Sequence, residues 1–151
     1  MSDASQAAFQ IEKIYVKDLS LEIPNAPQVF LQAESPQLEV QVNNEAVQCA
    51  EGLFECTVTV TVTARAGEKT LFLAEAAQAG LFSIRGVPAE DLEPLLGIAC
   101  PTILYPYVRE TISDVVTRGG FPPVLLSPVS FEALYAQRAQ QPDAPRIEVA
   151  Q

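Results

Sequence analysis

Apolar and polar side chains alternate without a break between Phe54 and Arg65. The apolar positions are Phe54, Cys56, Val58, Val60, Val62 and Ala64, and the positions between them hold Glu55, Thr57, Thr59, Thr61, Thr63 and Arg65. Successive side chains of a strand point to opposite faces, so this pattern predicts a β-strand with one buried face and one hydrated face. The β-branched Val and Thr residues favour the same structure. A chain with this stretch must build a sheet that buries one side.

A β-hairpin is predicted from this strand onwards. Residues 65–69 form the turn, in which Gly67 can adopt positive φ, and the return strand runs from Thr70 to about Ala79. If the even positions of both strands share a face, the buried face gains Phe72, Ala74 and Ala76, and the outer face gains Leu71, Leu73 and Glu75. Two leucines beside a carboxylate are either ordinary surface scatter or part of a docking patch, and the residues alone favour scatter.

The first strand is predicted over residues 9–23, where most odd positions are apolar. Lys13 and Lys17 interrupt the pattern, and Ile14 and Val16 are apolar exceptions on the other face. Asp18 and Glu22 project from the wetter face, where charges on an edge strand discourage unwanted pairing.

A loop at residues 24–36 follows, because Pro24 and Pro27 each fix φ and lack a backbone donor. It carries an unusually apolar triplet, Val29, Phe30 and Leu31, which either covers the domain's own core or lines a groove for another molecule. The next strand is predicted at residues 38–42, ending in a polar bend at residues 43–45.

The C-terminal half is predicted to be mostly helical after residues 81–84 close the sheet. A short helix follows Pro88 and is broken or bent at Pro94 and Gly97, and a longer helix runs from Pro101 to Arg118. Its apolar stripe consists of Ile103, Leu104, Tyr107, Val108, Ile112, Val115 and Val116. The stripe is broad enough for a helix lying between two sheets, which would require a partner subunit. An extended connector at residues 121–128 leads to a last helix from Phe131 to about Gln140, capped by Ser130.

Composition limits the classes of function. The 151 residues suffice for one domain, assigned to residues 9–141, with a disordered N-terminus at 1–8 and a flexible tail at 142–151. The net charge of −10 argues against binding to nucleic acid, and either keeps the protein soluble or attracts basic partners. The absence of a long apolar run and of a signal-peptide pattern predicts no membrane insertion and a cytoplasmic location. Cys49, Cys56 and Cys100 fit reduced thiols.

The usual catalytic groups are missing. The sequence has no histidine, no metal-ligand spacing and no glycine-rich phosphate loop, so neither a metal nor a cofactor is expected. We therefore predict that the protein is not an enzyme, with a catalytic carboxylate pair as the alternative left open.

Three stretches together resemble the bacterial protein-export chaperone family SecB. They are FQIEKIYVKDLSLEIPNAPQVF (residues 9–30), TVTVTARAGEKTLFLAEAAQAGLFSIRGV (residues 59–87) and CPTILYPYVRETISDVVTRGGFPPVLLSPVSFEALY (residues 100–135). The resemblance implies an α+β fold, a four-stranded antiparallel Greek-key sheet with helices packed on one face. It also implies a homotetramer, a dimer of dimers in which first strands pair and the long helices lie between the dimers.

The resemblance further implies an ATP-independent holdase that keeps precursor proteins unfolded and delivers them to the translocation ATPase SecA. A dedicated chaperone of a toxin–antitoxin system is the alternative. The implied SecA-binding residues are Asp18, Glu22, Leu73 and Glu75; the client-binding candidates are Val29, Phe30, Leu31, Phe131, Leu134 and Tyr135; and the oligomer-interface candidates are Ala74, Ala76, Gln78, Ile103, Tyr107 and Ile112. The tail has only Asp143 and Glu148 as acids, fewer than many family members carry there.

Overall fold

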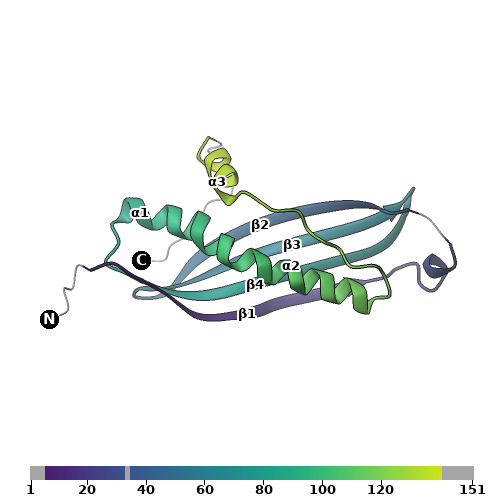
Figure 1. Cartoon of the computed structure of the whole chain (residues 1–151), viewed down its shortest axis with the longest axis horizontal. Helices are drawn as coiled ribbons and strands as arrows, with labels where there is room; N and C mark the ends of the chain where they lie inside the picture. The colour runs from purple at the N-terminus through teal and green to yellow at the C-terminus, as the bar shows by residue number, and fades with distance from the viewer. Residues whose placement is uncertain (1–5, 33–34, 141–151) are drawn as a thin grey trace.

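The computed structural model describes residues 6–32 and 35–140 as one antiparallel sheet with a layer of helices on one face (Figure 1). The strands are β1 (Ala8–Glu22), β2 (Gln37–Ala50), β3 (Leu53–Ala66) and β4 (Lys69–Arg85), in the order β1-β4-β3-β2. The helical elements are the 3-10 turn η1 (Gln28–Leu31), α1 (Ala89–Pro94), the π-helical turn η2 (Leu95–Ala99), α2 (Cys100–Arg118) and α3 (Phe131–Gln140). We call the helix-covered side of the sheet the inner face and the opposite side the outer face.

The β3–β4 hairpin confirms the predicted register. Val60 pairs with Ala76 and Val62 with Ala74, so the even positions of both strands share the inner face, where these residues are buried. Gly67 lies in the turn with φ of 63°, a conformation that favours glycine. This hairpin forms the centre of the hydrophobic core.

The predicted end of the return strand was wrong, because β4 continues past Gly80 to Arg85. Gly80 does not interrupt the strand but allows a close approach to the helix layer. A Cβ atom at this position would lie 2.9 Å from the ring of Phe82 and 3.0 Å from Cδ2 of Leu104 in α2. The glycine therefore marks a packing contact rather than a strand end.

Leu71 is a second correction, since it is buried instead of lying on the outer face. The register of β3 and β4 shifts between Ala64, which pairs with Phe72, and Arg65, which pairs with Thr70. The extra residue on β4 is Leu71, and such irregularities break the alternation of side chains.

Two register shifts in β1 explain the interruptions in its sequence pattern. They lie between Ile11 and Lys13 and between Val16 and Asp18, and each reverses which residues face inwards. Ile11 pairs with Phe82 on the inner face, and after the first shift Ile14, at an even position, faces inwards opposite Gly80. The two β-bulges therefore explain why Lys13 and Lys17 interrupt the apolar positions and why Ile14 and Val16 are apolar at even positions.

The bend predicted at residues 43–45 is absent, because β2 runs unbroken through them. Asn43, Asn44 and Glu45 pair with Thr59, Val58 and Thr57 of β3. Polar residues are poor indicators of a turn where a neighbouring strand satisfies the backbone hydrogen bonds.

The helix layer is centred on α2, which contacts β4 and β3. Pro94 and Gly97 do not end the preceding helix, because α1, η2 and α2 follow one another directly and the π-helical turn accommodates the irregularity. The connector returns beside α2, where the Tyr105 hydroxyl donates a hydrogen bond to the Ser127 carbonyl. The predicted cap of α3 is confirmed, since the Ala133 N–H donates to Ser130 Oγ at 3.2 Å. No helix in the described ranges is long and apolar enough to cross a membrane.

Candidate functional site

The structure brings the four predicted docking residues together on the outer face. Glu22 pairs with Leu73 and Ser20 pairs with Glu75, while Asp18 lies two positions further along β1 and pairs with Ala77. Asp18 and Glu22 are exposed, and Leu73 and Glu75 are half-buried. We call Asp18, Glu22, Leu73 and Glu75 the acidic patch; it combines three carboxylates with one apolar side chain.

Glu75 is positioned within the patch by the adjacent strand. The hydroxyl of Thr61 in β3 donates a hydrogen bond to Glu75 Oε2 at 2.7 Å. Within the described residues, no ion pair neutralises any of the three carboxylates of the acidic patch. A fixed and uncompensated negative charge of this kind attracts cationic groups.

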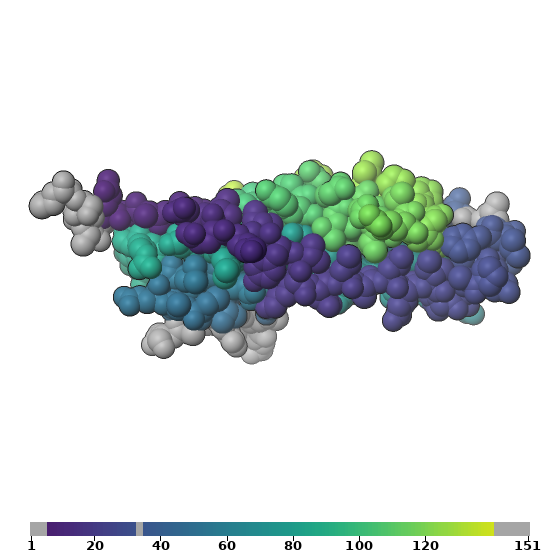
Figure 2. All heavy atoms as spheres, turned by 90° about the horizontal axis from the view of Figure 1, so that it is seen from below, coloured from purple at the N-terminus to yellow at the C-terminus, as the bar shows by residue number. Residues whose placement is uncertain are grey.

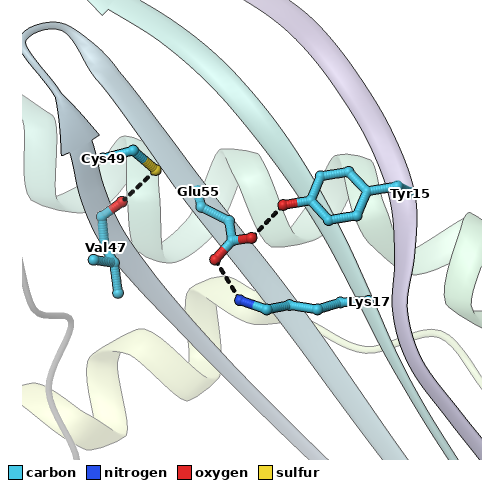
Figure 3. A network of polar contacts seen from close by, with 5 residues as sticks. All are labelled: Tyr15, Lys17, Val47, Cys49 and Glu55. Atoms are coloured by element: carbon cyan, nitrogen blue, oxygen red, sulfur yellow. Dashed lines mark hydrogen bonds and ion pairs between the residues drawn. The ribbon is translucent and has the colours of Figure 1, made fainter.

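A polar network joins β1 to β3 across the outer face, and its Lys17 directly precedes Asp18 in the chain (Figure 3). Lys17 Nζ on β1 forms an ion pair with Glu55 Oε1 on β3 at 2.7 Å, and the Tyr15 hydroxyl donates to Glu55 Oε2. These side chains span β4, which lies between their strands. Because Lys17 compensates the charge of Glu55, Glu55 adds no uncompensated negative charge to the acidic patch.

The network shifts the pKa values of all three members. Burial, and then the hydrogen bond to Glu55, raises the pKa of Tyr15 to about 12. The hydrogen bond to Glu55 raises the pKa of Lys17. Burial alone would raise the pKa of Glu55, but the hydrogen bonds from Lys17 and Tyr15 outweigh it and lower this pKa. The network therefore holds Glu55 as a carboxylate.

The lowered pKa of Glu55 predicts a specific loss of stability in acid. A carboxyl group with a depressed folded-state pKa stabilises the fold above its unfolded-state pKa, and this contribution disappears as the pH falls through the folded-state value. We expect the urea midpoint of the wild type to fall more steeply below pH 4.5 than that of Glu55→Gln. Parallel curves for the two proteins between pH 7 and pH 3 would contradict the contribution of the network.

An apolar pocket lies where the loop before β2 meets the helix layer. It has a volume of about 220 Å³, and Val29, Phe30, Leu71 and Phe121 contribute its apolar lining. The rings of Phe30 and Phe121 lie 5.2 Å apart. Leu31 points elsewhere and is 79% exposed. Both interpretations of this loop thus hold in part, since Val29 packs against the core while Phe30 and Leu31 leave apolar surface exposed.

The three candidates on α3 separate into two environments. Phe131 is only 2% exposed and packs edge-on against Tyr105, with ring centroids 5.8 Å apart. Its ring fills the protein's own core, so Phe131 offers no accessible surface to a client in this structure, and its role in client binding stays a prediction. Leu134 and Tyr135 are half-buried and stay accessible.

Sequence reasoning missed three exposed apolar residues on β2 and in the connector. Leu38 and Val40 face inwards on β2 yet are 47% and 44% exposed, and Leu125 of the connector is 81% exposed. β2 is the edge strand furthest from β1 and lies outside the main contacts of α2 with β4 and β3. The alternation at residues 38–42 predicted the strand, but only the reach of the helix layer determines that these side chains are left uncovered.

The proposed interface residues also divide by burial. Ala74, Ala76 and Ile112 are buried within the subunit, and their role in an oligomer interface stays a prediction. Gln78 is buried too, and its Oε1 accepts a hydrogen bond from Thr111 of α2 at 3.1 Å. The hydrogen bond from Thr111 joins Gln78 on β4 to α2.

Two parts of the subunit, the outward side of α2 and the edge strand β1, expose apolar surface or backbone that could contact another subunit. Tyr107 on α2 is 49% exposed, and Ile103 is half-buried. The edge strand β1 runs along the side of the molecule with its outer edge open (Figure 2). Exposed apolar residues on its inner face, Phe9, Ile11, Val16 and Leu19, extend the same surface towards α2.

Comparison with known proteins gives consistent matches over most of the chain. The family model described as "Preprotein translocase subunit SecB" matches residues 2–142. The "Protein-export protein SecB" of Chromobacterium violaceum is 63% identical over 140 residues, covering 92% of this chain and 93% of that protein. The protein of the same name from Dechloromonas aromatica is 52% identical over 149 residues, covering 99% and 98% of the two chains.

A solved structure has a similar fold at lower identity. It is a SecB-like chaperone of Mycobacterium tuberculosis in complex with a peptide from an antitoxin, with a TM-score of 0.67 and 20% identity, covering 80% of this chain and 90% of that one. On the strength of the family model and the relatives above 50% identity, this chain belongs to the SecB family of protein-export proteins.

Proposed function

We propose that this SecB-family protein is an ATP-independent holdase that binds unfolded precursor proteins in the cytoplasm and delivers them to SecA. The observation that carries the proposal is the exposed apolar surface around the connector and the loop before β2, in a protein similar throughout to export proteins. Monomeric soluble proteins seldom leave such surface uncovered without a partner.

The holding activity needs affinity but no covalent chemistry. A ligand that binds the unfolded state and not the native state delays folding by mass action. The client surface that we propose comprises Val29, Phe30, Leu31, Leu134 and Tyr135, extended by Leu38, Val40 and Leu125. These side chains offer apolar contacts that many client sequences can satisfy, as a general export chaperone requires.

The proposed docking site for SecA is the acidic patch. Its support is the combination of three uncompensated carboxylates with Leu73 on a face that the helices leave free. Complementary charge accelerates encounter, and an apolar residue within the patch adds contact area. Client and SecA would then occupy different faces of the sheet, so delivery would not require one to displace the other.

We also propose the assembly that the family resemblance implies, a dimer of dimers built on a Greek-key sheet. In the sheet, β2, β3 and β4 lie side by side in chain order, and β1 lies on the other side of β4. This strand order is compatible with a Greek key. Pairing of two β1 strands would cover the open edge, and contact through Tyr107 would cover the outward side of α2. The apolar surface of one subunit is thereby divided between self-association and client binding.

A refolding experiment tests the holding activity. We expect a stoichiometric amount of the tetramer to delay refolding of a slowly folding precursor and to suppress its aggregation, without added nucleotide. The measurement is the recovery of native fluorescence together with light scattering, and an equal mass of an unrelated acidic protein is the control. Refolding of the precursor at the same rate with and without excess chaperone would contradict the proposal.

The second candidate is a dedicated chaperone for an antitoxin. It is favoured by the similar fold of the mycobacterial SecB-like chaperone solved with an antitoxin peptide. The 63% identity to an export protein, against 20% to that chaperone, supports the export function more strongly. Binding of a single antitoxin and no precursor would reverse this order.

A further inference from the structure

The second β-bulge of β1 places a cation beside the acidic patch. The register of β1 on β4 shifts between Val16 and Asp18, and Lys17 is the extra residue at this shift. Consecutive residues of a regular strand point to opposite faces. Here Lys17 reaches Glu55 on the outer face, and Asp18 lies on that face as well, so the bulge brings two neighbours in the chain onto one side of the sheet.

A lysine that was free at this position would weaken the acidic patch. The Cα atoms of consecutive residues are about 3.8 Å apart. The flexible four-carbon stem of Lys17 is therefore long enough to bring its ammonium group to the carboxylate of Asp18. Such an ion pair would neutralise one of the three carboxylates that the patch presents, and a cationic partner would meet less negative charge.

The structure instead draws the ammonium group across β4 to Glu55. Lys17 Nζ lies 2.7 Å from Glu55 Oε1, and the Tyr15 hydroxyl donates to Oε2, so each carboxylate oxygen has a donor (Figure 3). The raised pKa of Tyr15, about 12, keeps this hydroxyl protonated at neutral pH. The Glu55 side chain is only 17% exposed, against 50% for Lys17, so water screens this end of the ion pair less. Glu55 is thus a fixed anchor for a mobile lysine.

Glu45 is the other carboxylate that acts on Lys17. The hydrogen bond to Glu55 is the main cause that raises the pKa of Lys17, and the charge of Glu45 adds a smaller contribution in the same direction. Glu45 is exposed on β2, and both β3 and β4 lie between that strand and β1. Because Asp18 is next to Lys17 on the same strand, it is the nearer partner once Glu55 is lost.

We propose that Glu55 is a positioning residue for docking, which holds Lys17 away from Asp18 and so keeps that carboxylate free to meet a cationic partner. This inference rests on the proposed docking of SecA to the acidic patch. Glu55 acts through Lys17 and need not contact the partner itself. Tyr15 supports this role by holding the second oxygen of the Glu55 carboxylate.

Glu55→Gln and Lys17→Met, alone and together, test the inference by calorimetric titration with SecA. Glu55→Gln releases Lys17 with little change in side-chain shape, and we expect it to weaken binding about fivefold, the upper range for one partly exposed ion pair. The reference is Glu51→Gln, which loses the same charge at an exposed position beside the β2–β3 turn. Lys17→Met should bind SecA at least as tightly as the wild type. The double variant should regain wild-type affinity, because no cation is left to release.

A purely structural role of the network predicts a different pattern. If the network only maintained the shape of β1, Lys17→Met would bind as weakly as Glu55→Gln, and the double variant would not recover. Either result would overturn the inference, as would equal affinities of Glu55→Gln and Glu51→Gln.

Asp18→Asn separates the role of Glu55 from docking itself. This variant should bind SecA more weakly than the wild type, and adding Glu55→Gln should then have little further effect, since Lys17 no longer has a carboxylate beside it to neutralise. A loss of the same size in both backgrounds would overturn the sequestration of Lys17. Failure of the wild type to bind SecA, or wild-type affinity of Asp18→Asn, would instead overturn docking at the acidic patch.

Discussion

Glu75→Lys is expected to weaken binding to SecA by about tenfold or more while leaving the fold intact. The substitution replaces one of three uncompensated carboxylates by a cation, so a docking partner with complementary charge meets repulsion at the same place. The folded protein loses only the hydrogen bond from Thr61 at a half-buried position, and its stability should change by about 1 kcal/mol or less. Isothermal titration calorimetry with SecA, paired with urea unfolding, measures both quantities.

Glu51→Lys is the matched control for this experiment. It causes the same change in net charge, but Glu51 lies beside the β2–β3 turn, where its carbonyl accepts from Arg85 at the far end of β4. Ten residues of strand separate Arg85 from Glu75, a distance of about 33 Å, which is well beyond the Debye length of roughly 8 Å at physiological salt. Equal losses of affinity in the two variants would indicate a general charge effect and contradict docking at the acidic patch.

Tyr107→Asp is expected to convert the proposed tetramer into dimers. Tyr107 is half exposed on the outward side of α2, beside a pocket formed with Pro106, Glu110 and Thr111. Burying an unpaired carboxylate in a contact between dimers costs several kcal/mol, which is enough to dissociate a contact of moderate affinity. The pairing of β1 strands is a separate contact and should survive, so native mass spectrometry should detect two subunits instead of four.

Tyr107→Phe distinguishes an interface effect from a defect in folding. It keeps the aromatic ring and should remain tetrameric, because the ring supplies most of the contact area. The thermal unfolding of the Tyr107→Asp subunit should stay cooperative. The Tyr107 side chain contributes little to the hydrophobic core, to which α2 contributes Leu104, Val108 and Ile112. A tetrameric Tyr107→Asp protein would exclude this side of α2 from the assembly.

The positions of the acidic-patch residues depend partly on local sequence pattern and partly on the pairing of distant strands. Period-two alternation is sufficient to place Asp18 and Glu22 on one face, and the hairpin register places Leu73 and Glu75 among the threonines. That β1 lies beside β4, with Glu22 opposite Leu73, depends on a pairing between segments about 50 residues apart in the chain, which no local pattern encodes. Their juxtaposition was implied by the family resemblance and not by spacing.

The sequence by itself determined the central hairpin, its glycine turn at Gly67, the stripe of α2 and the cap of α3, since each depends on contacts within a few residues along the chain. Only the tertiary structure decided that Leu71 is buried and that Leu38 and Val40 are left exposed. The physical reason is that burial depends on how far α2 reaches across the sheet and on where bulges shift the register. Both arise from contacts between segments that are distant in sequence.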